Sequence, residues 1–295
     1  MLLVGELAAI GTAFLFAVSS TLFTVAGRRA GAFAVNRARL LVAAAVAVLA
    51  HAIVYGHALP LQLPATAWYW LALSGFIGLA VGDDMLFRAF VRVGPAVSML
   101  IFSMSPALAA LLGWLFLDEA LTVVEVIGAG LTLSGIAWVV SAPQASVSAR
   151  RDWSGVLFAF GGAVGQAVGL VTAKIGMGYG AAPQQANTIR LVAAFASIWL
   201  LTALSGRVRE VFTALRAAPS AVTPTVVAAS LGPVIGVWLS LVAIERAPVG
   251  IASTLMSLTP LFVLPIARIA FHEPISKRAV TGALIAVSGV ALLLL

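Results

Sequence analysis

Residues 93–140 read VGPAVSMLIFSMSPALAALLGWLFLDEALTVVEVIGAGLTLSGIAWVV, and the chain repeats their pattern 154 residues later without a gap. Each copy is an apolar helix with a proline in its middle, a short acidic break and a second apolar helix. In lipid such helices are stable, because each satisfies its own backbone hydrogen bonds. The repeated pattern predicts a tandem duplication. The equivalent pairs are Pro106 and Pro260, Glu119 and Glu273, Gly128 and Gly282, and Gly135 and Gly289.

The composition indicates an integral membrane protein. The chain of 295 residues is 62% hydrophobic and 9% charged, with a mean hydropathy of +1.12, whereas soluble domains are roughly 45–50% apolar and about 25% charged. The net charge of +7 comes from lysines and arginines that lie between apolar stretches, so no nucleic-acid partner is expected. Cysteine is absent and the three histidines lie far apart, so neither a metal site nor a cofactor is expected.

Ten membrane helices are predicted, since a crossing needs about 20 apolar residues. The first half supplies about residues 5–27, 35–55, 67–88, 94–117 and 122–141, and the second about 153–175, 186–205, 222–244, 248–271 and 278–295. Because five is an odd number, the second half enters the membrane from the opposite side. The predicted fold is therefore all-α, with two inverted five-helix repeats and a substrate site at their interface near the bilayer midplane. The repeats are expected at 1–141 and 153–295, with a linker at 142–152.

The positive charges concentrate in the odd-numbered loops. Lysine and arginine are retained on the cytoplasmic side during insertion, so we expect these loops inside and both termini outside. Arg246 is the clear exception, while Lys174 and Arg190 lie near predicted helix ends. The residues assigned to the odd loops are Arg28, Arg29, Arg37, Arg39, Arg88, Arg92, Arg150, Arg151, Arg207, Arg209, Arg216, Lys277 and Arg278.

The duplicated halves resemble a known family. A proline in the fourth helix, a glutamate just before the fifth and a G-x6-G spacing within it are similar to the EamA-type transporters of the drug/metabolite transporter superfamily, which include a YddG-like group of amino-acid exporters. The resemblance covers nearly the whole chain. The residues that carry it are Pro106, Glu119, Gly128 and Gly135, and in the second half Pro260, Glu273, Gly282 and Gly289.

This resemblance implies a secondary transporter in the bacterial cytoplasmic (inner) membrane that exports small metabolites by alternating access. Amino acids are the first expectation, aromatic or other apolar ones in particular. Multidrug transport and the transport of sugars or nucleotide precursors are the alternatives. The implied partners are a small-molecule substrate and the lipid bilayer. A monomer is one expected working unit, and the sequence leaves other assemblies open. No nucleotide-binding G-x4-GK[ST] motif occurs, so a gradient is the expected driving force.

Asp83 and Asp84 are the most unusual residues of the predicted third helix. An intramembrane carboxylate is costly and marks a functional site by default; it could couple transport to protons or hold an ammonium group. The alternative is structural, because Asp84 and Arg88 have the spacing of an ion pair on one helix face. Asp84 and Arg88 also lie near the end of the predicted helix, where charges reach water.

Further candidate substrate-binding residues are amides, hydroxyls and thioethers inside predicted helices. Gln166 lies deep in a span and either binds substrate or joins helices. The fourth and ninth helices carry hydroxyls and methionines at matching levels, which suit a cavity for varied substrates or simple helix packing. Trp238 could face a substrate ring or lipid. Besides the two aspartates, the candidates are Gln166, Trp238, Ser105, Met104, Ser257 and Met256.

Two other classes of function are less favoured. An intramembrane enzyme needs catalytic residues that face one another, and the sequence offers no cysteine, no intramembrane histidine pair and no Gly-x-Ser-x-Gly. A channel normally repeats polar groups around an axis, whereas an inverted repeat favours two halves that rock. No catalytic residue is therefore expected.

Overall fold

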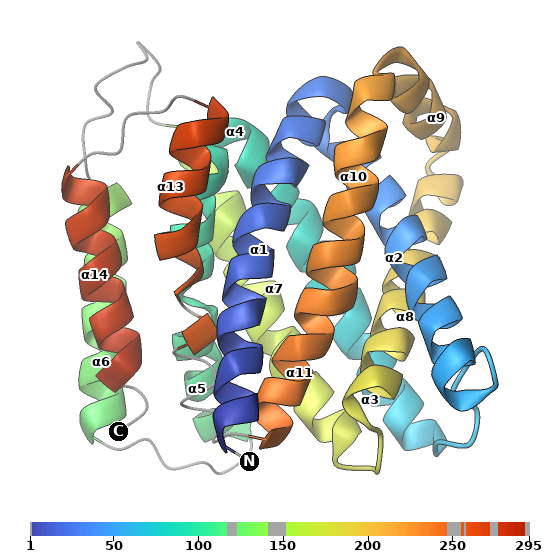
Figure 1. The fold of residues 1–295 in the computed structure, drawn as a ribbon, viewed down its shortest axis with the longest axis horizontal. Coiled ribbons are helices and arrows are strands. Elements are labelled where there is room, and N and C mark those ends of the chain that lie inside the picture. Colours follow the sequence, from blue (N-terminus) through green and yellow to red (C-terminus); the bar gives the residue numbers. More distant parts are fainter. Residues whose placement is uncertain are drawn as a thin grey trace.

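Figure 1 shows the computed structural model of the chain as a bundle of roughly aligned helices. The structure describes residues 2–116, 123–140, 152–246, 255–256, 258–271 and 277–292, and these ranges contain helices and no strand. Within them, six helical spans are long and apolar enough to cross a membrane. The protein is thus a multi-pass helical membrane protein, and the number of ten helices stays a prediction. The six spans are Val4–Ala30, Ala32–Tyr55, Ala65–Pro95, Trp153–Met177, Pro183–Leu204 and Pro219–Ala243.

A single residue joins the first two helices, α1 (Leu2–Ala30) and α2 (Ala32–Tyr55). This residue is Gly31, whose φ of 81° lies in the left-handed region that glycine adopts without a Cβ clash. The turn leaves no room for a loop. Arg37 and Arg39 therefore lie inside α2, where both are buried. Their assignment to the first odd loop was wrong.

The next span is one long helical run in three parts: α3 (Ala65–Ser74), the π-helix η1 (Gly75–Gly82) and α4 (Asp83–Phe102). α4 turns sharply at Gly94, which has a φ of 79° and a ψ of 166°. The chain then returns through Pro95 to Phe102. α5 (Ser105–Phe116) begins after an interruption at residues 103–104. The predicted helix 94–117 is therefore broken, and α6 (Val123–Val140) follows.

The second half repeats this order. α7 (Trp153–Met177) begins directly after its N-cap residue Asp152, whose carboxylate accepts a hydrogen bond of 3.1 Å from the backbone amide of Gly155. Hydrogen bonds from Ser154 and this amide lower the pKa of the Asp152 carboxyl. α8 (Pro183–Leu204) follows, and later come α10 (Val222–Ala229), the π-helix η3 (Ser230–Gly236) and α11 (Val237–Arg246). α13 (Thr259–Phe271) and α14 (Lys277–Leu292) are the last helices described.

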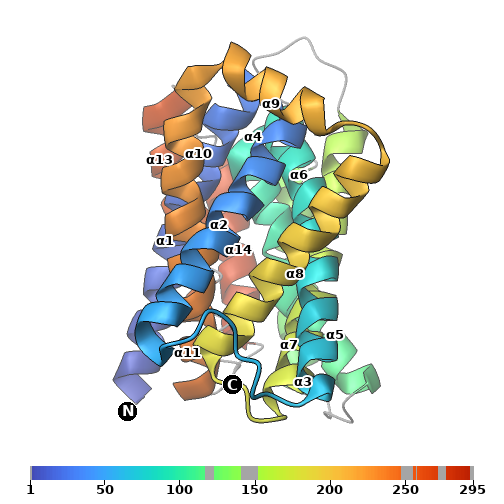
Figure 2. The same ribbon diagram turned by 90° about the vertical axis from the view of Figure 1, so that its right-hand side faces the viewer.

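Between α8 and α10 the chain forms an additional helix, α9 (Val208–Ala217), followed by the short 3₁₀-helix η2 (Pro219–Ala221). Figure 2 shows α9 lying across one end of the bundle. Val211 on its inner face is buried, and Arg209 and Arg216 on its outer face are exposed. The sequence prediction treated this stretch as a loop, because ten residues are too few for a crossing.

The two π-helices occupy equivalent positions, since residues 75–82 shifted by 154 become 229–236. A π-helix leaves its backbone groups poorly matched to the α-helical pattern and often marks a functional site. A polar side chain from the neighbouring helix hydrogen-bonds to each. Arg39 of α2 donates to the carbonyl oxygen of Leu79 at 3.0 Å, and Asn187 of α8 donates to that of Pro233 at 3.3 Å. Leu79 and Pro233 are themselves equivalent residues.

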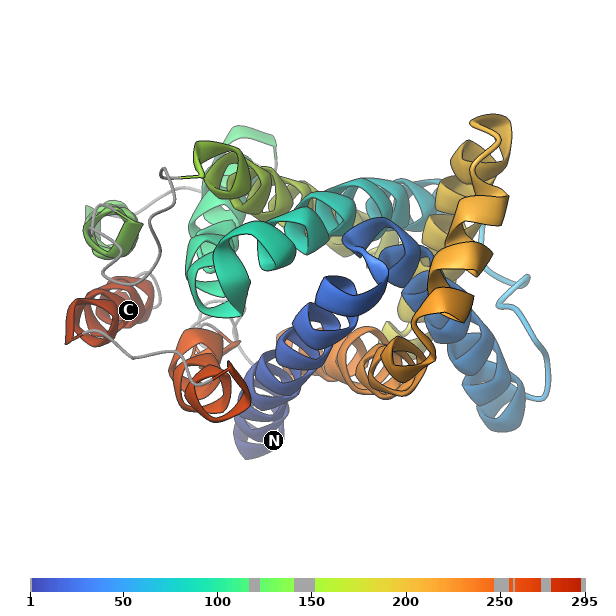
Figure 3. The same ribbon diagram turned by 90° about the horizontal axis from the view of Figure 1, so that it is seen from above.

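Glycines hold the two halves close together. A Cβ atom built on Gly165 of α7 would lie 2.7 Å from the Cα atom of Gly82, and one on Gly169 would lie 3.0 Å from that of Gly78. Such contacts leave no space for a side chain. Gly78 and Gly82, four residues apart, thus form a small-residue face against which α7 packs closely. Figure 3 shows α7 alongside the α3–α4 run, and α6 and α14 as a separate pair at the side of the bundle.

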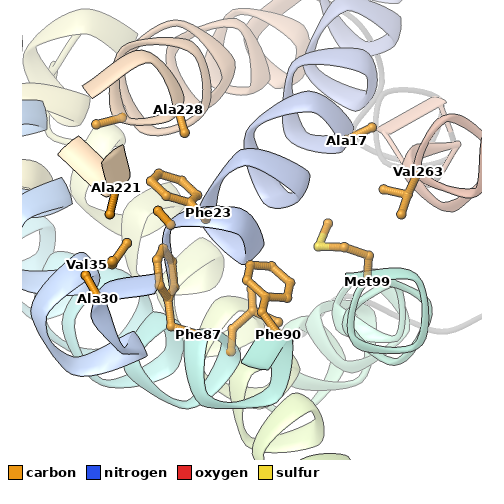
Figure 4. Close-up of a cluster of buried hydrophobic side chains, with 13 residues drawn as sticks. Ala17, Phe23, Ala30, Val35, Phe87, Phe90, Met99, Ala221, Ala228 and Val263 are labelled. Atoms are coloured by element: carbon orange, nitrogen blue, oxygen red, sulfur yellow. The ribbon is translucent and has the colours of Figure 1, made fainter. Parts of the chain in front are cut away.

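The largest buried cluster joins α1, α2, α4, α10 and α13. Figure 4 shows Phe23, Phe87 and Phe90 at its centre. The ring centroids of Phe23 and Phe87 are 4.8 Å apart, and those of Phe87 and Phe90 are 5.7 Å apart. We call these three residues the aromatic cluster. Val263 of α13 belongs to the larger buried cluster that surrounds these rings.

The two ends of the bundle differ in charge. α1 begins and α14 ends at the same end (Figure 1). The opposite end carries the turn at Gly31, the bend at Gly94 and helix α9. We call it the arginine-rich end, and its exposed basic residues are Arg28, Arg29, Arg92, Arg207, Arg209 and Arg216.

Candidate functional site: a cavity between the two halves

A cavity of about 70 Å³ lies among helices of both halves. Since one water needs roughly 10–15 Å³ of such space, the cavity holds several waters or part of a small solute. Hydroxyl and amide groups share its wall with aromatic and thioether side chains, and none of the lining residues is charged. These residues are Phe16, Met99, Phe102, Ser103, Ser105, Gln166, Ala167, Leu170, Ser240, Met256 and Thr259.

Residues from equivalent positions of the two halves face this cavity. The first helices of the halves align at a shift of 150 residues, the segments 36–39 and 187–190 of α2 and α8 at 151, and the later helices at 154. The cavity is therefore lined by equivalent residues of both halves. The equivalent pairs on its wall are Phe16 with Gln166, Phe102 with Met256, and Ser105 with Thr259.

Two helices begin at the cavity. α5 starts at Ser105 and α13 starts at Thr259, and both residues line the cavity. The first backbone amides of a helix have no partner within it, and the helix dipole adds partial positive charge there. Helix interruptions of this kind place hydrogen-bond donors inside a membrane protein without a charged side chain. The second residue of each helix is a proline, Pro106 or Pro260, which has no N–H, and the amides of Leu261 and Phe262 already bind the carbonyl oxygen of Leu258. The helix dipoles nevertheless favour a carboxylate or carbonyl oxygen at this end of the cavity.

The aromatic cluster separates the cavity from the arginine-rich end. On α1, Phe16 lines the cavity and Phe23 lies two turns further toward Ala30. Met99 belongs both to the cavity wall and to the buried cluster around these rings. Figure 4 shows its side chain pointing toward them. In this structure a solute in the cavity is therefore blocked on that side by packed aromatic side chains.

Asp83 and Asp84 lie at the start of α4 and form ion pairs with α2 instead of lining the cavity. Asp83 binds Nη1 of Arg39 at 2.8 Å. Asp84 binds Arg37, and it also binds Nη2 of Arg88 at 2.6 Å, which is the pair predicted from their spacing. The amide of Asn36 donates to Asp84 at 3.3 Å. The aspartates thus join α4 to α2, which the sequence analysis had not foreseen.

The other predicted residues fall into three groups. Gln166, Ser105 and Met256 line the cavity together. Met104 packs against a neighbouring apolar cluster, and Trp238 is 40% exposed. Ser257, like Glu119 and Glu273, lies outside the described residues.

Sequence reasoning missed several residues of the site. Phe16 and Phe102 were passed over because aromatic residues in an apolar helix carry no signal of their own. The repeat alignment contains the missing signal, since each is the equivalent of a predicted candidate, Gln166 or Met256. Arg39 was missed because it was placed in a loop.

These features define a class: a helical membrane protein of two similar halves with a small, uncharged cavity between them. The EamA-like transporter family model matches residues 3–141 and 153–295, once in each half. The chain belongs to the EamA-like transporter family, and it is a membrane transporter of small molecules.

A solved structure supports the same fold. A crystal structure described only as that of a protein has a TM-score of 0.64 and 20% sequence identity, covering 96% of this chain and 95% of that chain. At this identity the likeness shows the fold alone. No curated protein matches the chain.

Proposed function

We propose that the protein is a secondary transporter that exports amino acids, in particular aromatic or other apolar ones, by alternating access of the cavity to the two sides of the membrane. The observation that carries this proposal is the pairing of equivalent residues around one cavity. If the halves are inverted, as predicted, each conformation that opens the cavity to one side has a counterpart that opens it to the other.

The wall of the cavity supports an amino acid as substrate. Apolar side chains such as Phe16 and Met99 suit an apolar or aromatic side group. The positive ends of the helix dipoles at Ser105 and Thr259 favour a carboxylate, and the Ser105 hydroxyl can donate a hydrogen bond to it. The Gln166 amide and the hydroxyl of Ser240 offer acceptors to an ammonium group. A net charge would find no counter-ion among the lining residues, so a zwitterion with no net charge fits better than an ion.

The direct test is uptake of labelled amino acids into liposomes that contain the purified protein. Saturable uptake, stimulated by unlabelled amino acid inside, is expected of a carrier. Passage of ions without counter-exchange would instead indicate a channel, and chemical change of the solute would indicate an enzyme. If folded protein moves no amino acid under any gradient, the amino-acid assignment is wrong, and drugs, sugars and nucleotide precursors become the candidates.

Filling the cavity is expected to stop transport without unfolding the protein. Ser105→Leu and Thr259→Leu each add an apolar group to a cavity of about 70 Å³ and should lower the rate of exchange at least about tenfold, since an extra methylene in a close-fitting site already changes selectivity about 10-fold or more. Ser134→Leu is the matched control, because Ser134 is exposed on α6. Equal transport activity of all three variants would show that this cavity is not the substrate site.

We further propose that the protein lies in the bacterial cytoplasmic membrane with the arginine-rich end inside and both termini outside. The exposed arginines of that end support this orientation, because basic loops stay in the cytoplasm. The orientation no longer draws on Arg37 and Arg39, which are buried in α2.

Two cysteine variants test this orientation, since the chain has no cysteine of its own. Thr213 is exposed on α9, and Leu61 is exposed beyond α2 at the other end of the bundle. In intact cells an impermeant maleimide is expected to label Leu61→Cys at once and Thr213→Cys only after lysis. The reverse pattern would place the termini inside.

A further inference from the structure

Arg190 is a buried cation whose hydrogen bonds are unmade. The residue lies in α8 and is 1% exposed. Its Nε, Nη1 and Nη2 atoms find no hydrogen-bond partner within the described part of the chain. A charge buried without a partner costs several kcal/mol in a protein interior, and a membrane adds to the penalty. Such a residue is expected to have a partner in another state of the protein.

A Cβ atom built on Gly78 would lie 3.8 Å from Nη2 of Arg190, which places this guanidinium beside η1, shortly before Asp83. Among the described residues, Asp83 is the carboxylate that favours the charge of Arg190. In this structure Asp83 is bound to Arg39 at 2.8 Å. Asp84 is already shared between Arg37 and Arg88. Two buried guanidinium groups, Arg39 and Arg190, therefore compete for one carboxylate, and one of them holds it.

The two competitors are equivalent residues of the two halves. Arg39 and Arg190 end the matched segments 36–39 and 187–190 of α2 and α8, whereas the equivalent of Asp83 is Val237. In a transporter with inverted repeats, the opposite state arises when the halves exchange conformations. Arg190 should then acquire the paired surroundings that Arg39 has here. Of the two aspartates at this level, Asp84 is already held by Arg37 and Arg88, so within the described residues the Asp83 carboxylate is the one that can serve both arginines.

Arg39 also connects this ion pair to the barrier above the cavity. Its guanidinium lies 5.1 Å from the ring centroid of Phe87 and 5.8 Å from that of Phe23. These are distances at which a cation is attracted to an aromatic face. The Asp83–Arg39 pair therefore holds the aromatic cluster in its packed arrangement, and its release would loosen the barrier at the arginine-rich end.

We propose that Asp83 alternates between Arg39 and Arg190 during the transport cycle, bound to Arg39 while the arginine-rich end is closed and to Arg190 while it is open. This inference rests on the proposed alternating access. Arg190 is a positioning residue that acts through Asp83, because it does not line the cavity. An ion pair in each state keeps the two states close in free energy, so neither traps the transporter.

The test measures which side the cavity faces, and it requires no substrate. Ser103 lines the cavity, and Ser103→Cys is labelled by an impermeant maleimide added from the arginine-rich side. Labelling of Thr213→Cys in parallel samples measures the fraction of molecules whose arginine-rich side is accessible to the reagent. The ratio of the two labelling rates reports how often the arginine-rich end is open.

Arg190→Gln and Arg39→Gln are expected to shift this ratio in opposite directions. Arg190→Gln removes the partner needed by the open state, so labelling should fall about tenfold or more. Arg39→Gln removes the partner of the closed state, so labelling should rise. Arg190→Lys keeps the charge and should return the ratio toward the parent value. Arg88→Gln is the control, because Arg88 is half exposed and pairs with Asp84, and it should leave the ratio unchanged.

A purely structural role for Arg190 predicts a different result. Shifts in the same direction for both glutamine variants, or no shift in protein that elutes as a single species, would overturn the proposal. If a glutamine variant is not recovered folded, Val237→Asp provides a second test. It gives Arg190 a carboxylate of its own, so Asp83 can stay on Arg39, the closed state is favoured and the labelling should fall. An unchanged labelling ratio for Val237→Asp would also overturn the proposal. Absence of amino-acid flux alone would contradict the proposed substrate and leave this readout intact.

Discussion

Asp83→Asn is expected to cause one of the two largest losses of stability among single substitutions in this protein. The change leaves the Arg39 guanidinium buried without its partner at 2.8 Å, and it removes the carboxylate that favours the charge of Arg190. Breaking a buried pair from one side costs about 3–5 kcal/mol. For a chain of this size each kcal/mol corresponds to about 2–4 °C, so thermal unfolding in detergent should show a fall in Tm of about 10 °C.

A double variant separates the lost pair from the stranded charge. Asp83→Asn combined with Arg39→Gln removes both charges of the pair and should recover part of the lost Tm, because no charge is left unpaired at position 39, whereas Arg190 still lacks the Asp83 carboxylate. Glu210→Gln is the control, since it breaks the ion pair of Arg207 and Glu210, where both side chains are about half exposed, and exposed pairs contribute little. A Tm for Asp83→Asn within a degree of the parent would show that the pair carries no stability.

Gly75→Ala is expected to cause a comparable loss for a steric reason. A Cβ atom at residue 75 would overlap the carbonyl oxygen of Arg190 and lie 2.8 Å from its Cα atom. Backbone cannot swing aside as a side chain can, so α8 has to move away from the start of η1. Overpacking of this kind costs about 1–3 kcal/mol and sometimes more. Size-exclusion chromatography and thermal unfolding in detergent should both show the damage.

The matched control for this substitution is Gly130→Ala. A Cβ atom at Gly130 of α6 would meet nothing within 4 Å, and alanine is the better helix former. Its Tm should equal or slightly exceed that of the parent. If Gly75→Ala unfolds at the same temperature as Gly130→Ala, α8 and η1 do not approach as closely as described.

The duplication, the membrane class and the family were readable from the sequence because each depends on a pattern within one chain. Equivalent residues such as Pro106 and Pro260 recur at one shift, and long apolar stretches need lipid or a deep interior. The cavity was partly readable for the same reason. Gln166, Ser105 and Met256 were chosen as polar or adaptable groups inside apolar helices, and all three line it.

The ion pairs were not readable, because they depend on where a helix starts and which helix it meets. The predicted helix 35–55 already contained Arg39, but the residue was counted among the loop charges because the one-residue turn at Gly31 was not foreseen. Its partner Asp83 lies on another helix, so no i,i+4 spacing connects them. The pair of Asp84 and Arg88, four residues apart, was readable. Helix breaks at residues 103–104 and the π-helices likewise follow from packing between helices rather than from local composition.

The π-helices at residues 75–82 and 230–236 also carry a record of ancestry. Because π-helices are rare, the same feature at equivalent positions of both halves is what duplication of one ancestral half would leave. Directly after these segments the halves differ, since the equivalent positions carry Asp83 in the first half and Val237 in the second. The duplicated backbone is thus shared, whereas the buried carboxylate belongs to one half.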